Sequence, residues 1–82
     1  MQLEILTPDK KIYEGEVSSV SLPGITGGFQ VLNNHAPLIS ALSKGTLTLE
    51  SPEGSQKMNI KSGFVEVLNN RVVVLIEGAE IL

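Results

Sequence analysis

The 82-residue chain carries 9 acidic and 6 basic residues, a net charge of −3, and no cysteine. A chain this short has room for one hydrophobic core, so we expect a single domain over residues 1–82. The composition excludes disulfide bonds, thiolate zinc sites and a cysteine nucleophile, and the scattered lysines argue against nucleic-acid binding.

The N-terminal residues Met-Gln-Leu-Glu lack the charged start and apolar core of a signal peptide. No apolar run approaches the roughly 20 residues that cross a bilayer as a helix. We therefore expect neither signal-peptide export nor a membrane span.

Alternation of apolar and polar residues dominates the chain and predicts strands that bury one face. Residues 2–5, 46–50 and 57–61 are the clearest examples, and helical periodicity is nearly absent. The pattern changes phase at Ser18-Ser19, which predicts a bulge. Residues 72–76, Val-Val-Val-Leu-Ile, are apolar on both faces, so this strand is either covered on both sides or meets a partner with its outer face.

Turn residues separate the strands at short intervals. Asn69-Asn70 suits a type I′ hairpin, because asparagine tolerates left-handed backbone angles, and Pro52-Glu53-Gly54 predicts a second reversal. Lys44-Gly45 and Ser62-Gly63 mark further breaks. About ten short strands in so small a chain predict an all-β fold, a ten-stranded β-sandwich of two packed antiparallel sheets or a flattened barrel.

The glycine-rich segment 22–29 does not match a phosphate-binding loop, because neither G-x-x-x-x-G-K-[ST] nor G-x-G-x-x-G is present and no helix follows. Its glycines suit either a demanding loop conformation or the close approach of another molecule. One imidazole without thiolates is too few ligands for zinc, and we expect no metal or cofactor.

His35 is the only histidine, and its neighbourhood in the sequence supplies neither a nucleophile nor an orienting carboxylate. A hydrogen-bonded structural histidine and an interface contact both remain open. A small hydrolase that uses His35 with Glu66 or Glu77 would require these side chains to converge in a cleft.

Four segments together resemble one known family: Leu-Glu-Ile-Leu-Thr-Pro at 3–8, Tyr-Glu-Gly-Glu-Val at 13–17, Leu-Pro-Gly at 22–24, and Gly-Gly-Phe-Gln-Val-Leu-Asn-Asn-His-Ala-Pro-Leu at 27–38. The likeness continues through residues 42–45 and 62–67. The sequence resembles the epsilon subunit of bacterial F-type ATP synthases, called delta in mitochondria.

This resemblance implies a ten-stranded β-sandwich in the central stalk that binds the gamma subunit and the c-ring and couples proton flow to ATP synthesis without catalysing a reaction. It implies a peripheral position on the cytoplasmic face of the inner membrane, held there only through the complex. By motif position, the residues facing the c-ring would be Gly27, Gly28, Phe29, Gln30 and His35. Those facing gamma would be Thr7, His35 and Ser40.

Two departures from the family pattern affect what the resemblance implies. Many members have an acidic residue where this chain has Gly28, so charge pairing with a basic c-ring loop is not expected there. Most bacterial members continue into a helical hairpin that inhibits ATP hydrolysis, and this sequence ends at Leu82 without it. A naturally short form and a piece of a longer protein are both compatible with the sequence, and Met1 without a tag favours the first.

A function of another class is a free-standing β-sandwich module that binds a peptide or carbohydrate through its loops. The two hypotheses differ in the surface they require. A ligand-binding module needs an ordinary polar surface, whereas a rotor subunit exposes an apolar patch for its partner to cover.

Overall fold

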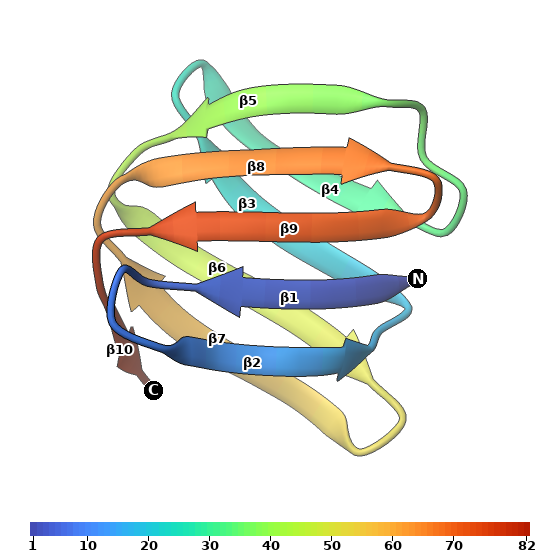
Figure 1. Ribbon diagram of the computed structural model, residues 1–82, viewed down its shortest axis with the longest axis horizontal. Helices are drawn as coiled ribbons and strands as arrows, with labels where there is room; N and C mark the ends of the chain where they lie inside the picture. Colours follow the sequence, from blue (N-terminus) through green and yellow to red (C-terminus); the bar gives the residue numbers. More distant parts are fainter.

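The computed structural model describes residues 1–82 and contains ten β-strands and no helix (Figure 1). No segment of it is therefore a helix long and apolar enough to cross a membrane. The strands are β1 (Gln2–Leu6), β2 (Lys11–Glu16), β3 (Ser19–Gly24), β4 (Gly27–Leu32), β5 (Leu38–Leu42), β6 (Gly45–Ser51), β7 (Gly54–Ile60), β8 (Gly63–Leu68), β9 (Arg71–Ile76) and β10 (Ala79–Ile81).

The strands form two layers, as Figure 1 shows. The front sheet has the order β5-β8-β9-β1-β2, and the back sheet has the order β4-β3-β6-β7-β10. A single bridge between Gly24 of β3 and Leu42 of β5 joins the layers along one side. This arrangement confirms the all-β class and the ten-stranded sandwich.

One strand pair differs from the expected antiparallel pattern. β1 runs parallel to β9, with Leu3 beside Val72 and Ile5 beside Val74. No hairpin joins these two strands, so no turn fixes their relative direction. Their register is set instead by the need to bury all four side chains on one face.

The space between the sheets is filled by one cluster of 17 buried apolar residues. Buried and outward-facing residues alternate along the strands, as the apolar and polar pattern of the sequence predicted. Leu47 and Leu49 of β6, for example, are buried, whereas the intervening Thr48 is only partly covered. Full burial of each such aliphatic side chain contributes about 1.5–3 kcal/mol, so this cluster is the main source of stability.

Both predicted hairpin turns are confirmed. Asn69 and Asn70 have φ angles of 52° and 59°, the left-handed values of a type I′ turn, and Gly54 has φ 124° after the Pro52-Glu53 reversal. The prediction of a bulge at Ser18-Ser19 is wrong, because these residues lie where the chain leaves β2 and enters β3. The register irregularity instead falls between Ile5 and Leu6, opposite β2.

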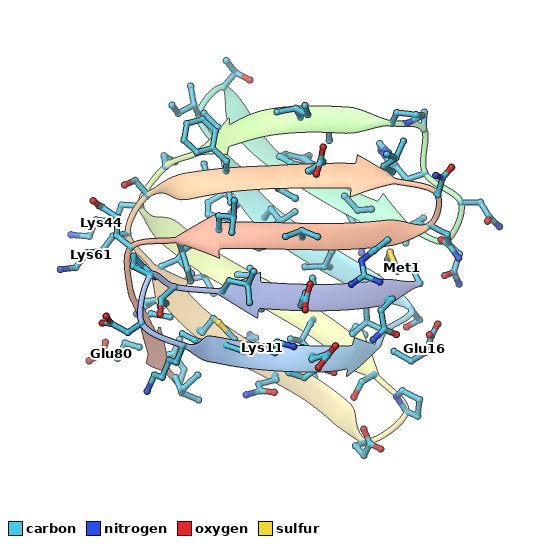
Figure 2. The ribbon with its side chains drawn as sticks, viewed as in Figure 1. Met1, Lys11, Glu16, Lys44, Lys61 and Glu80 are labelled. Atoms are coloured by element: carbon cyan, nitrogen blue, oxygen red, sulfur yellow. The ribbon has the colours of Figure 1, made fainter.

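The α-amino group of Met1 is tied into the fold at the edge of the core. It donates hydrogen bonds to Glu16 Oε2 at 2.6 Å, to Asn33 Oδ1 at 2.6 Å and to the carbonyl of Val17 at 3.0 Å. Figure 2 shows Met1 and Glu16 at this end of the sandwich. Three acceptors match the three N–H donors of the ammonium group, so the start of β1 is fixed to β2 and to the loop after β4.

We predict that Leu49→Asp unfolds the domain. Leu49 is 1% exposed, and the variant would lose a core side chain and bury an unpaired carboxylate, for at least about 4 kcal/mol. A domain of this size has roughly 4–12 kcal/mol of total stability. Urea unfolding followed by circular dichroism measures the effect, with Thr48→Asp on the outer face of the same strand as the control. Equal midpoints for the two variants would contradict the assignment of the core face.

Candidate docking face

The outer surface of the front sheet carries apolar side chains that no other part of the chain covers. Ile39 is 73% exposed, Phe64 58% and Leu75 51%. We call this surface the apolar face, defined by Leu6, Ile39, Ala41, Phe64, Leu68, Val73 and Leu75. Contiguous exposed apolar patches are rare on monomeric proteins and mark sites of interaction.

Strand register brings these side chains together from four strands, β1, β5, β8 and β9. One row crosses the sheet from β5 to β1 through Ala41, Phe64, Leu75 and Leu6. The next row, two residues along each strand, contains Ile39, Glu66, Val73 and Glu4. Successive residues on a strand alternate between faces, so both rows point away from the core.

A hollow of about 510 Å³ runs along the first row, and all four of its side chains line it. It is lined mostly by apolar side chains, including Leu6, Ile25, Phe64 and Leu75. The N–H of Ile25 donates to the carbonyl of Ala41 at 3.2 Å, which holds the β3–β4 turn beside the sheet. A Cβ at Gly63 would collide with the carbonyl oxygen of Leu75, so glycine lets β8 begin close against β9. The hollow is suited to receive an apolar side chain of a partner.

The outer surface of the back sheet is polar by contrast. Its strands present short hydrophilic side chains, with Thr46 Oγ1 donating to Asn59 Oδ1 at 3.0 Å. Ser21 and Thr48 face each other on neighbouring strands in the same layer. The two outer surfaces therefore differ in chemistry: the front one carries a contiguous apolar patch, whereas on the back one the exposed Leu32 of β4 stands among polar side chains.

Charged residues border the apolar face along β1 and β2. Lys11 Nζ lies 3.1 Å from Glu4 Oε2 and 2.9 Å from Glu14 Oε1, and Arg71 Nη2 lies 3.4 Å from Glu4 Oε1. The hydrogen bond from Lys11 holds the pKa of Glu4 below its ordinary value of 4.5. The pKa of Lys11 is raised above 10.5, mainly by its hydrogen bond to Glu14 and then by that to Glu4. This border of the apolar face is therefore polar, and its positive and negative charges neutralise one another.

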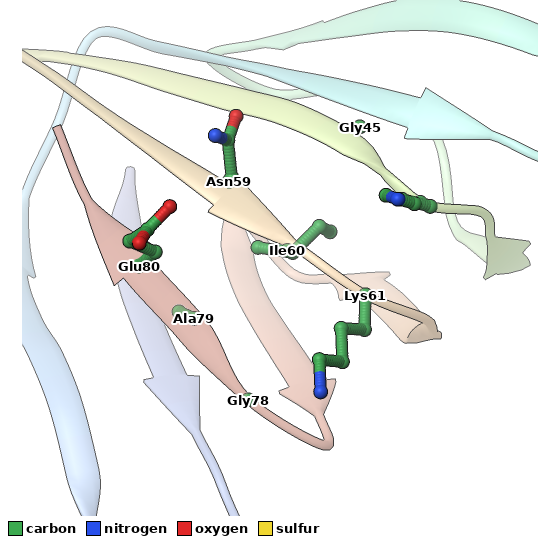
Figure 3. A pocket seen from close by; sticks show the side chains of 8 residues that line it. Gly45, Asn59, Ile60, Lys61, Gly78, Ala79 and Glu80 are labelled. Carbon is green, nitrogen blue, oxygen red and sulfur yellow. The ribbon is translucent and has the colours of Figure 1, made fainter.

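A second hollow, of about 540 Å³, lies where β6, β7 and β10 meet (Figure 3). Figure 3 shows the Lys61 side chain extending beside Gly78, and Lys44, Asn59 and Glu80 also line the space. Nowhere in the structure do three or more histidine, cysteine or acidic side chains gather as metal ligands. The hollow is polar and contains no combination of residues typical of catalysis.

The structure does not gather the expected c-ring residues into one cluster. Gly27, Gly28, Phe29 and Gln30 lie in β4 beside the β3–β4 turn, whereas His35 follows the other end of that strand. Gly27 and Leu32 are roughly 17 Å apart at the rise of an extended strand. The two parts of the expected site therefore lie at opposite ends of the sandwich.

The expected gamma residues are also distributed. Thr7 lines the apolar hollow beside Phe64. Ser40 is half-buried and lies on the opposite side of β5 from Ile39, with its hydroxyl donating to the carbonyl of Ala41 at 3.2 Å. Of these positions, only Thr7 adjoins the apolar face.

The residues of the hydrolase hypothesis do not converge. His35 Nδ1 lies 2.7 Å from the carbonyl oxygen of Ala36, and no hydrogen bond joins its ring to a carboxylate. Glu77 accepts a hydrogen bond from Ser62 at 3.1 Å and belongs to the β9–β10 connection, whereas His35 belongs to the β4–β5 loop. These two connections lie at opposite ends of the sandwich (Figure 1). Glu66 lies between them on the front surface, so this chain does not form the cleft that the hypothesis requires.

The sequence pattern alone did not identify Phe64 or Ile39 as interaction residues. A signal for Phe64 exists in residues 63–68, Gly-Phe-Val-Glu-Val-Leu, where apolar residues occupy both phases of the strand. The ambiguous strand 72–76 is also resolved: its inner phase is buried, and Val73 and Leu75 lie outward, the first half-buried and the second exposed.

A β-sandwich with one uncovered apolar surface is typical of domains that dock on another protein. The family model described as the ATP synthase, Delta/Epsilon chain, beta-sandwich domain matches residues 1–81. The chain belongs to this family, which confirms the resemblance read from the sequence.

The relatives include an ATP synthase epsilon chain of Synechocystis, 40% identical over 81 residues, which cover 99% of this chain and 60% of that protein. An epsilon chain of Chlorobium limicola is 42% identical over 77 residues, covering 93% of this chain and 88% of that protein. This chain thus spans about three fifths of the length of the first relative and most of the second.

Solved structures show the same fold. In a Euglena gracilis mitochondrial ATP synthase structure, described as OSCP/F1/c-ring, a chain matches with a TM-score of 0.90 at 23% identity, over 96% of this chain and 51% of that one. A chain in the central stalk/c-ring structure of the Tetrahymena thermophila enzyme matches with a TM-score of 0.82 at 16% identity, over 95% of this chain and 63% of that one. At these identities the likeness establishes the fold alone.

We predict that Lys11→Gln raises the pKa of Glu4 toward 4.5, since the largest cause of its lowering is removed. Because the pKa of Glu4 is lower in the folded than in the unfolded chain, its ion pair stabilises the fold above the unfolded-state pKa, and this effect is lost as pH falls through the folded-state pKa. Because the pKa of Lys11 is raised in the folded chain, its ion pairs stabilise the fold below pH 10.5, and this effect is lost as pH rises through the folded-state pKa. The variant is therefore less stable between about pH 4.5 and 10.5, and the difference shrinks on both sides.

Carbon-13 NMR titration of the Glu4 carboxyl and urea unfolding across this pH range measure both effects. Lys57→Gln, on the back sheet, is the matched control. An unchanged Glu4 titration in Lys11→Gln would contradict the ion pair.

Proposed function

We propose that this chain is a non-catalytic subunit of the central stalk of an F-type ATP synthase, which binds the gamma subunit and the c-ring. Membership of the delta/epsilon family supports the complex. The observation that carries the docking role is the apolar face, which pairs a broad apolar surface with an adjacent hollow. Gamma is the partner that we assign to it.

The energetics of the apolar face suit a permanent attachment. Fully covering a large aliphatic or aromatic side chain contributes about 1.5–3 kcal/mol, and a few buried anchors dominate most interfaces. Phe64 at the centre of the first row is the best anchor, because it lies between Ala41 and Leu75 and borders the hollow. Thr7, Ser40 and His35 are proposed as further gamma contacts.

The c-ring contact is proposed at Gly27, Gly28, Phe29 and Gln30, with His35 as a further contact. β4 pairs only with β3, so its second edge has main-chain groups free to bond to another molecule. Gly27 and Gly28 have no side chains to keep such a molecule at a distance.

In this function the domain acts mechanically. It remains attached to gamma and to the c-ring while torque passes between them, and it thereby couples proton flow to ATP synthesis. The close-packed core between two sheets gives the rigidity that this role needs. The proposed location is the cytoplasmic face of the inner membrane, peripheral and only through the complex.

A ligand-binding module is the second candidate, favoured by the polar hollow between β6, β7 and β10 (Figure 3). A peptide or a carbohydrate that binds there would contact Lys44, Lys61 and Asn59. The extended apolar face has no role in that function, which is why we place it second.

We predict a stable one-to-one complex when this chain is mixed with the gamma subunit of the same organism. Phe64→Glu weakens the complex at least about 100-fold, because it replaces an anchor with a charge that docking would desolvate. The isolated fold is unaffected, since Phe64 lies outside the core.

Size-exclusion chromatography with light scattering, followed by calorimetry, measures both quantities. Thr46→Glu on the back sheet is the control and binds like the wild type. If both proteins are folded and no complex forms, the rotor assignment is wrong and a screen of peptides and carbohydrates follows.

We further predict that His35→Glu weakens docking and leaves thermal stability nearly unchanged, within about 0.5 kcal/mol, because the side chain lies in a loop outside the core. The same calorimetric titration and a thermal melt of the isolated variant measure the two effects. An unfolding midpoint lowered as far as in Leu49→Asp would show that His35 is structural.

A further inference from the structure

Glu66 places a carboxylate in the middle of the apolar face. Across the sheet it lies between Ile39 of β5 and Val73 of β9. Along β8 its neighbours on the same face are Phe64 and Leu68. A partner that covers these four apolar side chains also covers Glu66.

The other carboxylates on this surface have cations from the same chain. Glu4 and Glu14 contact Lys11, and Glu16 contacts the ammonium group of Met1. No ion pair or hydrogen bond of the structure involves the carboxylate of Glu66. Arg71 shares a shallow hollow with it, but the guanidinium group is paired with Glu4 at 3.4 Å. Glu66 is thus an exposed, unpaired anion surrounded by apolar groups.

Docking changes the environment of this anion. In the free chain water solvates it, whereas a covering partner removes that water. An unpaired buried carboxylate is strongly unfavourable, and it offsets the gain from covering a neighbouring apolar side chain. The face therefore favours a partner that brings a positive charge to this position and disfavours one that is wholly apolar.

We propose that an arginine of the gamma subunit pairs with Glu66 in the docked complex and makes Glu66 a determinant of partner specificity. This inference rests on the proposed function. Arginine fits better than lysine, because its planar guanidinium binds a carboxylate through two hydrogen bonds and is weakly hydrated. Phe64, two residues earlier on the same face, offers an aromatic surface beside the charge.

The alternative role for Glu66 is to keep an apolar surface hydrated in the free chain. The two roles predict opposite effects of removing the charge. If a gamma cation pairs with Glu66, Glu66→Gln weakens docking. If no cation does, Glu66→Gln leaves docking unchanged or strengthens it, because less desolvation accompanies binding.

The test is calorimetric titration of the 82-residue chain and its variants with the gamma subunit at two salt concentrations. Glu66→Gln is expected to raise Kd about 10- to 30-fold and to reduce the salt dependence of binding, and Glu66→Lys to raise Kd more. Glu53→Gln, in the β6–β7 turn on the other side of the molecule, is the matched control and binds like the wild type. Unfolding midpoints of the free variants confirm that each is folded.

Substituting the arginines and lysines of gamma singly with alanine then identifies the pairing residue. One arginine variant is expected to show no further loss when combined with Glu66→Gln, and a gamma Arg→Glu change at that position to restore binding of Glu66→Lys. Coupling to a lysine alone would overturn the assignment of arginine. Wild-type affinity in Glu66→Gln would overturn the pairing while the gamma complex itself stands, whereas failure of the wild-type chain to bind gamma would overturn both proposals.

Discussion

Burial of one face of every strand between two sheets is the constraint on which the rest of this structure depends. Side chains alternate along a strand, so filling the core uses only every second residue. The remaining residues are free to differ between the two outer surfaces. Here the back sheet presents Ser21, Thr46 and Thr48, and the front sheet presents Ile39, Phe64 and Leu75. The same pleat that builds the core therefore also builds the apolar face.

A domain of this size gains little stability beyond what its core provides, because a short chain leaves much of its surface in water. A partner on the apolar face would add burial that the chain alone cannot supply, and binding to the folded state stabilises it. The ion pairs of Glu4 and Lys11 along the edge of that face contribute less, since exposed pairs are well solvated. In the proposed function, stability and docking are thus linked through one surface.

Much of the fold followed from local pattern. The strands, the Asn69-Asn70 hairpin and the buried phase of Leu47 and Leu49 are local features, and each was predicted. The parallel pairing of β1 with β9 was not, because it joins distant segments that no turn connects. The bulge was misplaced for a related reason. A change of phase at Ser18-Ser19 marks the end of a strand as readily as an irregularity within one, and only the pairing partner distinguishes the two.

By itself the sequence determined the fold class, the family and the presence of a strand apolar on both faces, because periodicity, turn chemistry and motif order are all properties of neighbouring residues. Only the tertiary structure decided which apolar residues share a surface. Ala41, Phe64, Leu75 and Leu6 form one row because cross-strand register aligns the β8–β9 hairpin with β5 and β1, which are far from it in the chain. The position of Glu66 among them, without a cation, depends on the same long-range register and could not be read from residues 63–68 alone.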